Sequence, residues 1–453
     1  MKSFNHNRRR FLRNSLAACL GSASFAALSA RMQLAIAQTT PTDDYRALVC
    51  VFLYGGNDSY NMIIPADGSG YSTYQDVRQN LAVAKSDLLP MNRGGHAYGF
   101  HPAMTDVSTL YNTGKLAVLA NTGALIEPVS KPDYQNNRSR LPPQLFSHND
   151  QQNFVQALNR DTATTGWAGR AADIMGSLNI NQQLSMNISL SGSNIFQTGT
   201  KVVPYSVSGY GVERLKHFDS SGDTADATRA QVFRALMQSA DQHVLQREYA
   251  AVQERAWALS GEVKAALDEQ PPLQTVFPGD KLGTDLSMVA RLISAREALN
   301  VKRQIYFVGM GDFDTHGDQN NRQPALFAQL SQALSAFNQA THELGLADKI
   351  TTFTLSDFGR TLTSNGDGTD HAWGGHQLIM GGAVKGGNIY GQLPSLALDS
   401  SDDIGEGRII PTTSVDQYGA TLASWFGLPT ADFASTFPNL KNFSTVDLGF
   451  IDN

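Results

Sequence analysis

Four short apolar runs, each of strand length, constrain the fold of this chain more than any other feature. They cover residues 47–53, 115–121, 304–308 and 350–355. A continuous apolar run of this length is typical of a strand that is covered on both faces of a sheet. Because helix-like patterns separate the runs, we predict an α/β fold with a doubly wound, mostly parallel sheet and helices on both faces.

Helical spacing of apolar residues fills much of the chain between these runs. We predict helices over residues 101–111, 147–158, 166–175, 285–298 (with Asp285 as its N-cap), 325–344 and 414–426. Residues 225–267 predict a long helix or a helical hairpin laid on the sheet. Residues 183–218 alternate between polar and apolar, which predicts short antiparallel strands or an edge ribbon, whereas residues 66–100 are expected to be irregular. We expect one domain over residues 38–453, with an inserted ribbon and helical segment at 180–285.

The amino terminus has the pattern of a targeting segment. Residues 8–13, RRRFLR, fit the twin-arginine pattern, and a weakly hydrophobic run follows at residues 16–28. Ala35-Ile36-Ala37 supplies a small-x-small cleavage site. We therefore predict that residues 1–37 are a twin-arginine signal peptide and that the protein is periplasmic or secreted.

Composition narrows the classes of partner. The formal net charge is −6, so the chain has no basic surplus with which to neutralise phosphates, and we expect no nucleic-acid partner. After the signal peptide no stretch of about 20 apolar residues occurs, so we expect no membrane span. Cys50 is the one cysteine after the signal peptide, and its apolar surroundings predict a small core residue.

Polar side chains with metal-binding chemistry follow three of the apolar runs. Asp58 follows the first run, Asp312, Asp314 and His316 follow the third, and Asp357 follows the fourth. Ligands of α/β proteins bind where loops leave the carboxyl ends of parallel strands, so we expect these side chains near one site. Carboxylates and imidazoles are the ligands from which Zn²⁺ and Mn²⁺ sites are built. One ion, or two ions about 4 Å apart, would suit such a set.

Further candidate residues come from a loop and from a helix start. The loop after the fourth run contains Arg360, Asp370, His371 and His376. Ser147 stands at the predicted start of a helix. Its hydroxyl is either an N-cap or a nucleophile or ligand, because the amides and the dipole of a helix N-terminus favour anions.

Seven motifs together resemble one protein family. In chain order they are LVCVFLYGGND, FHPAM, SHNDQQ, GWAGR, GDFDTHGDQ, LSDFGRT and GTDHAWGGH. They resemble the exported bacterial family called domain of unknown function 1501, over essentially the whole chain after the signal peptide. That family is grouped with the alkaline phosphatase and sulfatase superfamily. The resemblance implies an alkaline phosphatase-like fold and, as activity, metal-dependent hydrolysis of phosphate or sulfate esters.

The resemblance also implies roles for individual residues. The implied metal ligands are Asp58, Asp314, His316, Asp357, His371 and His376, with Asp312 as an alternative to Asp314. Only one of His371 and His376 is needed for the last superfamily position. Ser147 is the implied nucleophile, with Thr122 as the alternative, and Arg360 would steady the anionic group.

Two departures from the superfamily pattern leave two hypotheses open. Phe358 stands where the superfamily has a histidine after Asp357, and His371 could replace that imidazole by folding back. Ser147 lacks the surroundings needed for formylglycine, so an ordinary sulfatase is not expected. The first hypothesis is a hydrolase that uses one or two divalent ions, Zn or Mn, on a small anionic ester. The second is an exported binding or assembly protein that keeps the fold, has lost hydrolysis and has a protein partner.

Overall fold

The computed structural model describes residues 44–158, 164–212, 224–238 and 244–452. The predicted signal peptide lies outside the described residues. Residues Arg46–Asn453 form one compact unit. Within the described residues, no helix is both long enough and apolar enough to cross a membrane.

A central sheet of nine strands among the described residues organises this unit. Its order is β11-β5-β10-β9-β1-β8-β6-β7, with β12 also paired to β5. The strands are β1 (Arg46–Leu53), β5 (Leu116–Gly123), β6 (Asn187–Ser189), β7 (Tyr205–Ser206), β8 (Arg303–Met310), β9 (Ile350–Ser356), β10 (Gly375–Gly381), β11 (Ile389–Tyr390) and β12 (Thr413–Ser414). The four apolar runs form β1, β5, β8 and β9. All pairings are parallel except those of β10, which runs antiparallel to β5 and β9. The prediction of a mostly parallel sheet is confirmed.

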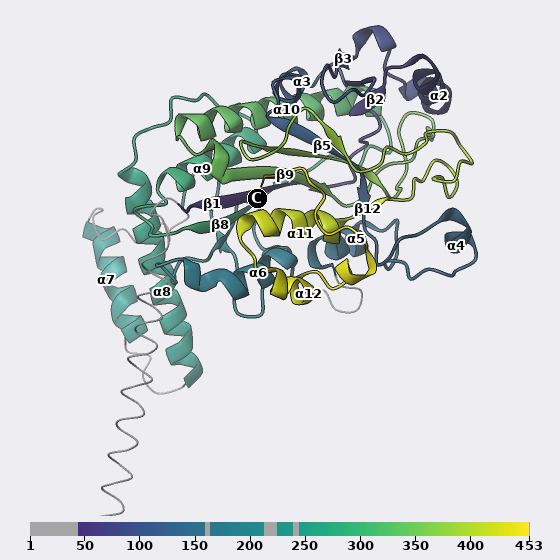
Figure 1. Cartoon of the computed structure of the whole chain (residues 1–453). Helices are drawn as coiled ribbons and strands as arrows, with labels where there is room; N and C mark the ends of the chain where they lie inside the picture. Colours follow the sequence, from purple (N-terminus) through teal and green to yellow (C-terminus); the bar gives the residue numbers. More distant parts are fainter. Residues whose placement is uncertain (1–43, 159–163, 213–223, 239–243, 453) are drawn as a thin grey trace, which may run out of the picture. The chain divides into compact units, whose positions relative to one another are not determined.

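Helices cover both faces of this sheet, as the alternating pattern predicts (Figure 1). One face carries α3 (Thr105–Asn112), α9 (Lys281–Ser294) and α10 (Gln319–Glu343), and the other carries α5 (His148–Ala157), α6 (Trp167–Met175), α11 (Val415–Phe426) and α12 (Phe433–Thr436). A large hydrophobic core lies between the sheet and this second layer. There Trp167 of α6 packs against Phe353 of β9, with ring centroids 6.2 Å apart, and both are buried.

Two helices begin earlier than predicted. Helix α9 begins at Lys281 and is capped by Asp280, whose Oδ1 accepts a hydrogen bond from the Gly283 amide at 2.8 Å. The predicted cap Asp285 is therefore wrong, and this residue lies buried inside the helix. Helix α10 begins at Gln319, six residues before the prediction, and includes Pro324 in its second turn. Because proline has no amide hydrogen, the helix lacks the hydrogen bond that residue 324 would otherwise donate to the carbonyl of Asn320.

Residues 66–100 are more regular than predicted. They contain α2 (Gly68–Arg78) and, with β2 (Ile63–Pro65), a small antiparallel sheet in which β4 (Tyr98–Phe100) lies between β2 and β3 (Leu89–Pro90). The Asp67 side chain caps α2. Tyr74 and Val77 are buried at a spacing of three residues, which is a helical spacing. Helix α4 (Lys131–Gln135) is a further short element.

Of the two alternatives predicted for residues 183–218, short antiparallel strands or an edge ribbon, the antiparallel strands are wrong. Strands β6 and β7 pair parallel to each other, and β6 pairs parallel to β8, so they extend the central sheet. The helical hairpin is present as α7 (Thr224–Gln238) and α8 (Val244–Asp268), which meet through the rings of Phe233 and Trp257. Helix α8 packs on α9, so the hairpin is attached to the sheet through that helix.

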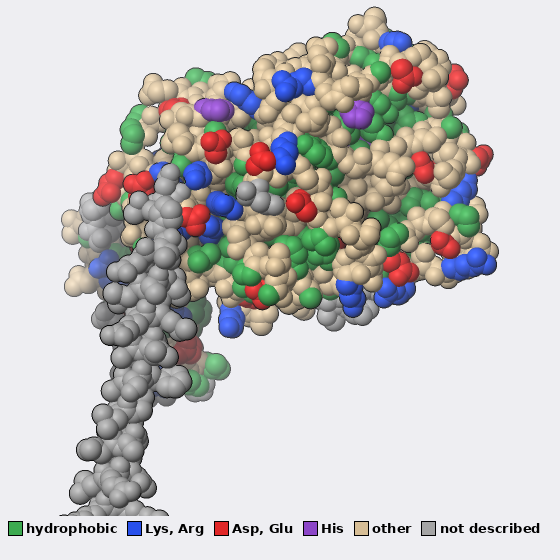
Figure 2. Space-filling model, in the orientation of Figure 1, with side chains coloured by type: hydrophobic (Ala, Val, Ile, Leu, Met, Phe, Trp, Pro, Cys, Tyr) green, Lys and Arg blue, Asp and Glu red, His purple; other side chains and the backbone are tan. Residues whose placement is uncertain are grey.

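The visible surface has mixed polarity. On the face drawn in Figure 2, acidic and basic side chains are interspersed, and apolar side chains lie between them in small groups. This mixture agrees with the small formal net charge of −6.

Candidate metal centre

The carboxyl ends of β1, β8 and β9 lie at one edge of the sheet, because these three strands are parallel neighbours. The loops that leave this edge contain most of the predicted site residues. Strand β10 runs the opposite way, so its beginning lies at the same edge, and it brings the preceding loop with His371 there. Helix α5, which packs against β9, adds its first residue, His148.

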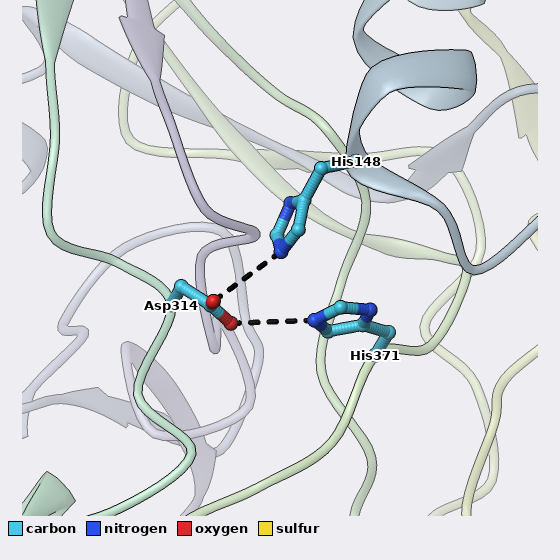
Figure 3. Close-up of side chains that lie close together, drawn as sticks. All are labelled: His148, Asp314 and His371. Carbon is cyan, nitrogen blue, oxygen red and sulfur yellow. Dashed lines mark hydrogen bonds and ion pairs between the residues drawn. The ribbon is translucent and has the colours of Figure 1, made fainter.

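Three side chains converge at this edge (Figure 3). His148, Asp314 and His371 each offer one donor atom, and these atoms all lie within 4.8 Å of one another. The Asp314 carboxylate lies between the two rings, with Oδ2 3.4 Å from His148 Nε2 and Oδ1 3.3 Å from His371 Nε2.

His316 extends this group to a fourth side chain. Its Nε2 lies 2.8 Å from His371 Nε2 and 3.1 Å from Asp314 Oδ1. The side chains of His316 and Asp314 are 45% and 43% exposed, whereas those of His148 and His371 are 28% and 23% exposed. We call these four residues the histidine cluster. It is open to solvent on the side of His316 and Asp314.

The other ring nitrogen of each histidine faces an acceptor. His148 Nδ1 lies 2.7 Å from Asp357 Oδ2, and His316 Nδ1 lies 2.9 Å from Asp370 Oδ1. His371 Nδ1 lies 2.7 Å from the carbonyl oxygen of Phe146. Carboxylate and carbonyl oxygens only accept, so these contacts assign the ring N–H of each neutral imidazole to Nδ1. Each Nε2 then directs a lone pair into the histidine cluster.

A divalent cation matches this arrangement. Three imidazole lone pairs and one carboxylate converge, and His148 Nε2 is buried without a hydrogen-bond partner. The closest separations between their donor atoms, 2.8 to 3.4 Å, are near the roughly 3.3 Å expected between tetrahedral ligands about 2.0–2.1 Å from Zn²⁺. Metal-bound histidines usually donate their second ring N–H to a carboxylate or a carbonyl, as all three do here.

Charge in the histidine cluster favours the metal-binding protonation states of two residues. Burial lowers the pKa of His371, which keeps that ring neutral. Burial alone would raise the pKa of Asp314, but the hydrogen bond and positive charge of Arg360 outweigh it, so this pKa is lowered. The hydrogen bond to Asp357 raises the pKa of His148, so a metal ion there would have to displace a more tightly held proton.

The guanidinium group of Arg360 is hydrogen-bonded to other residues of the chain. Its side chain is fully buried. It donates to Asp314 Oδ1 at 2.6 Å, to the Gly55 carbonyl at 3.1 Å, and to both the hydroxyl and the carbonyl oxygen of Thr369. Arg360 therefore holds Asp314 in place. These bonds use the guanidinium group that sequence reasoning assigned to the anionic group of a substrate.

Phe358 supports two members of the histidine cluster. Its ring centroid lies 4.8 Å from the rings of both His148 and His371. An apolar ring thus packs against both imidazoles at the position where the resemblance implied a histidine. His371 joins the histidine cluster from the loop before β10, as expected if it folds back to replace that imidazole.

The remaining predicted ligands lie outside the histidine cluster. Asp357 stands behind His148 and also accepts hydrogen bonds from the Gly55 amide and Gln152. Asp58 pairs with Arg78 and Gln319. His376 is buried, with its Nδ1 accepting from the Asn121 amide at 3.1 Å. Asp312, the alternative to Asp314, is exposed and has a positive φ of 73°.

The two candidate nucleophiles have different surroundings. Ser147 is the N-cap residue of α5 without a capping hydrogen bond, and its hydroxyl donates to Asp150 Oδ2 at 2.6 Å. Thr122 lies within β5, buried, and its hydroxyl has no hydrogen-bond partner.

Sequence reasoning missed one member of the histidine cluster, His148. The available signal was the motif SHNDQQ, in which the hydroxyl of Ser147 was singled out and the neighbouring imidazole was passed over.

Comparisons with known proteins add a family match and distant structural similarity. The family model described as "Protein of unknown function (DUF1501)" matches residues 45–428. A search of curated proteins found no match. Among solved structures, the complex of Ps i-CgsB with k-i-k-neocarrahexaose is 8% identical with a TM-score of 0.37, covering 89% of this chain and 75% of that chain. The PsFucS1 sulfatase from Pseudoalteromonas sp. is 8% identical with a TM-score of 0.34, covering 89% and 71%. Similarity at these TM-scores carries no argument about the site.

Proposed function

Because the chain belongs to the DUF1501 family, and that membership assigns no function, we propose a function from the site: metal-dependent hydrolysis of phosphate or sulfate esters. One observation carries the proposal. Three histidines have their Nδ1 atoms held by Asp357, Asp370 and the Phe146 carbonyl, and all three direct Nε2 toward Asp314. Hydrogen bonds within the protein therefore hold these side chains in a geometry that suits a cation before any cation binds.

His148, Asp314 and His371 would hold the ion, with His316 as a fourth ligand. Imidazole and carboxylate ligands of this kind favour Zn²⁺, and Mn²⁺ is the second choice. A bound divalent ion would act as a Lewis acid on an oxygen of the ester. Arg360 would keep Asp314 oriented and ionised through its 2.6 Å hydrogen bond.

Ser147 is the proposed nucleophile. Its hydroxyl already donates to the Asp150 carboxylate at 2.6 Å, so a proton acceptor is within reach of the attacking oxygen. Ser147 also directly precedes His148, a proposed ligand of the ion, in the chain. The substrate would then be a small anionic ester, for which the ion would supply a Lewis acid and Ser147 the attacking hydroxyl.

Fold type and location complete the proposal. The doubly wound sheet with the histidine cluster at the carboxyl ends of its parallel strands supports an alkaline phosphatase-like fold. The RRRFLR motif and the small-x-small site before Gln38 support export by the twin-arginine pathway to the periplasm or beyond.

Metal content and ester hydrolysis test the proposal on the purified protein. We expect at least one bound divalent ion per chain, and hydrolysis of an aryl phosphate, a phosphodiester or an aryl sulfate that chelator abolishes. His371→Ala should lower metal affinity by about 10-fold or more and remove the activity, and Ser147→Ala should remove the activity while keeping the ion. His96→Ala, at an exposed histidine outside the histidine cluster, is the matched control. A metal-free protein that is inert on every ester contradicts the proposal.

One observation favours a second candidate, an exported protein that binds a metal ion and a protein partner without hydrolysis. The buried guanidinium of Arg360 donates four hydrogen bonds to Asp314, Gly55 and Thr369, so most of its N–H groups are used within the protein and not on a substrate anion. A protein that contains the ion but hydrolyses none of the three ester classes would support this candidate.

A further inference from the structure

The carboxylate of Asp58, which follows β1, is buried and lies outside the histidine cluster. Asp58 is 1% exposed, and sequence reasoning assigned it to a metal ion. Its Oδ2 accepts hydrogen bonds from Arg78 Nη2 and, at 2.6 Å, from Gln319 Nε2. Through Oδ2 the carboxylate is therefore already paired with a cation that the chain itself supplies, whereas its Oδ1 is buried without a hydrogen-bond partner.

Arg78 is fixed in this position by further acceptors. Its side chain is fully buried. Its Nε donates to Asn61 Oδ1 at 3.1 Å, and its Nη1 donates to the carbonyl oxygens of Thr361 and Leu362 at 3.0 and 3.3 Å. Moving the guanidinium away from Asp58 would break these hydrogen bonds and leave a positive charge buried without its partner.

The pair of Asp58 and Arg78 belongs to the same hydrogen-bond network as the histidine cluster. Gln319, which donates to Asp58, accepts from the Thr369 hydroxyl at 2.8 Å. Thr369 accepts hydrogen bonds from Arg360, and Arg360 donates to Asp314. Two buried guanidinium groups thus each neutralise one carboxylate, the first at Asp58 and the second at the edge of the histidine cluster.

We propose that Arg78 is a permanent internal cation for Asp58, so that this site takes one divalent ion and not two. The inference rests on the proposed metal-dependent function. A second ion at Asp58 would have to displace Arg78 or lie beside it. Displacement leaves a buried charge unpaired, which should weaken binding of that ion by about 100-fold or more. Among the described residues, no further group of three histidine, cysteine or acidic side chains surrounds Asp58 to offset this loss.

The stoichiometry of metal binding tests the inference directly. Metal-free full-length protein is titrated with Zn²⁺ in a calorimeter, and bound zinc is measured after dialysis. We expect one equivalent for the wild-type protein. Asp58→Asn should still bind one equivalent, with an affinity within about threefold of wild type, because Asp58 contributes no ligand. Asp314→Asn, the matched change inside the histidine cluster, should weaken binding by about 10-fold or more.

Each possible number of bound zinc equivalents either supports or overturns the inference. Two equivalents for wild type, or loss of the single equivalent in Asp58→Asn while the protein stays folded by circular dichroism, would overturn the inference. Zero equivalents would refute the proposed function together with the inference, so the two failures are distinguishable. If Asp58→Asn does not fold, the wild-type stoichiometry and that of Arg78→Lys, which keeps a cation at the position, still decide between one ion and two.

Discussion

Gly55 and Gly56 show how single residues make room for the histidine cluster. Both have positive φ, +111° and +83°, which glycine adopts without strain. A Cβ on Gly55 would lie 2.3 Å from the Asp314 amide nitrogen, and a Cβ on Gly56 would lie 2.5 Å from Phe358 Cε2. The two glycines therefore allow the loop of Asp314 and the ring of Phe358 to approach β1.

Gly56→Ala should damage the histidine cluster through Phe358. The added methyl group would push the phenylalanine ring, which packs against His148 and His371, and the positive φ would add strain. We expect a loss of about 1–3 kcal/mol in the free energy of unfolding and Zn²⁺ binding at least about 10-fold weaker. Denaturant unfolding and calorimetric titration measure the two effects.

Gly95→Ala is the control for this prediction. Gly95 has a similar φ of +71°, but a Cβ there would meet no atom within 4 Å. It should lose stability through backbone strain alone and keep the metal affinity of wild type. Equal metal affinity in the Gly56 and Gly95 variants would show that Phe358 does not position the histidines.

Helix α11 combines a start signal that is local in sequence with a buried titratable side chain. Ser414 and Gln417 form a capping box, so the start of this helix is readable from sequence. Asp416 in its first turn is buried and accepts hydrogen bonds from the Asn439 amide and side chain. Burial raises the pKa of Asp416 from its ordinary value to about 7, although these hydrogen bonds and Arg170 oppose that shift.

The raised pKa of Asp416 predicts a pH dependence of stability. Between about pH 4 and pH 7 the folded protein keeps a proton on Asp416 that the unfolded chain has released. The free energy of unfolding should therefore fall as pH rises through this window, by up to roughly 4 kcal/mol from this residue. Asp416→Asn should remove that fall, which denaturant unfolding at several pH values measures. Asp76→Asn, at an exposed aspartate, should leave the wild-type slope unchanged.

At the scale of the whole molecule, the histidine cluster joins segments that are far apart in sequence. His148 begins α5, Asp314 and His316 follow β8, and His371 precedes β10. An ion held by all of them would link both the second helical layer and the loops to the sheet. Because the unfolded chain does not hold these residues together, binding favours the folded state.

Removal of the metal should therefore lower the thermal stability of the whole protein. With free Zn²⁺ at 100 times Kd, the free energy of unfolding should exceed that of the chelated protein by about 2.7 kcal/mol. Scanning calorimetry with and without chelator measures the difference in Tm. His371→Ala, with its affinity lowered about 10-fold or more, should gain no more than about 1.4 kcal/mol at the same free Zn²⁺, and a wild-type Tm that does not respond to Zn²⁺ would contradict the prediction.

The sequence by itself determined the architecture. Four of the nine strands of the central sheet, β1, β5, β8 and β9, were predictable because continuous apolar runs report burial on both faces, a local property. Their parallel arrangement was predictable because helical patterns separate them. Asp314, His316 and His371 could be chosen as candidates because their residue types carry metal-binding chemistry.

Only the tertiary structure decided which side chains meet. Asp58 and Asp314 both follow buried strands, yet Arg78 neutralises the first while three imidazoles converge on the second. His148 joins them because α5 packs against β9, and Phe358 fills the place of a histidine because the Gly56 backbone leaves room for its ring. Residue type determines which partners a side chain can bind, whereas the packing of distant segments determines which of them it contacts in the folded protein.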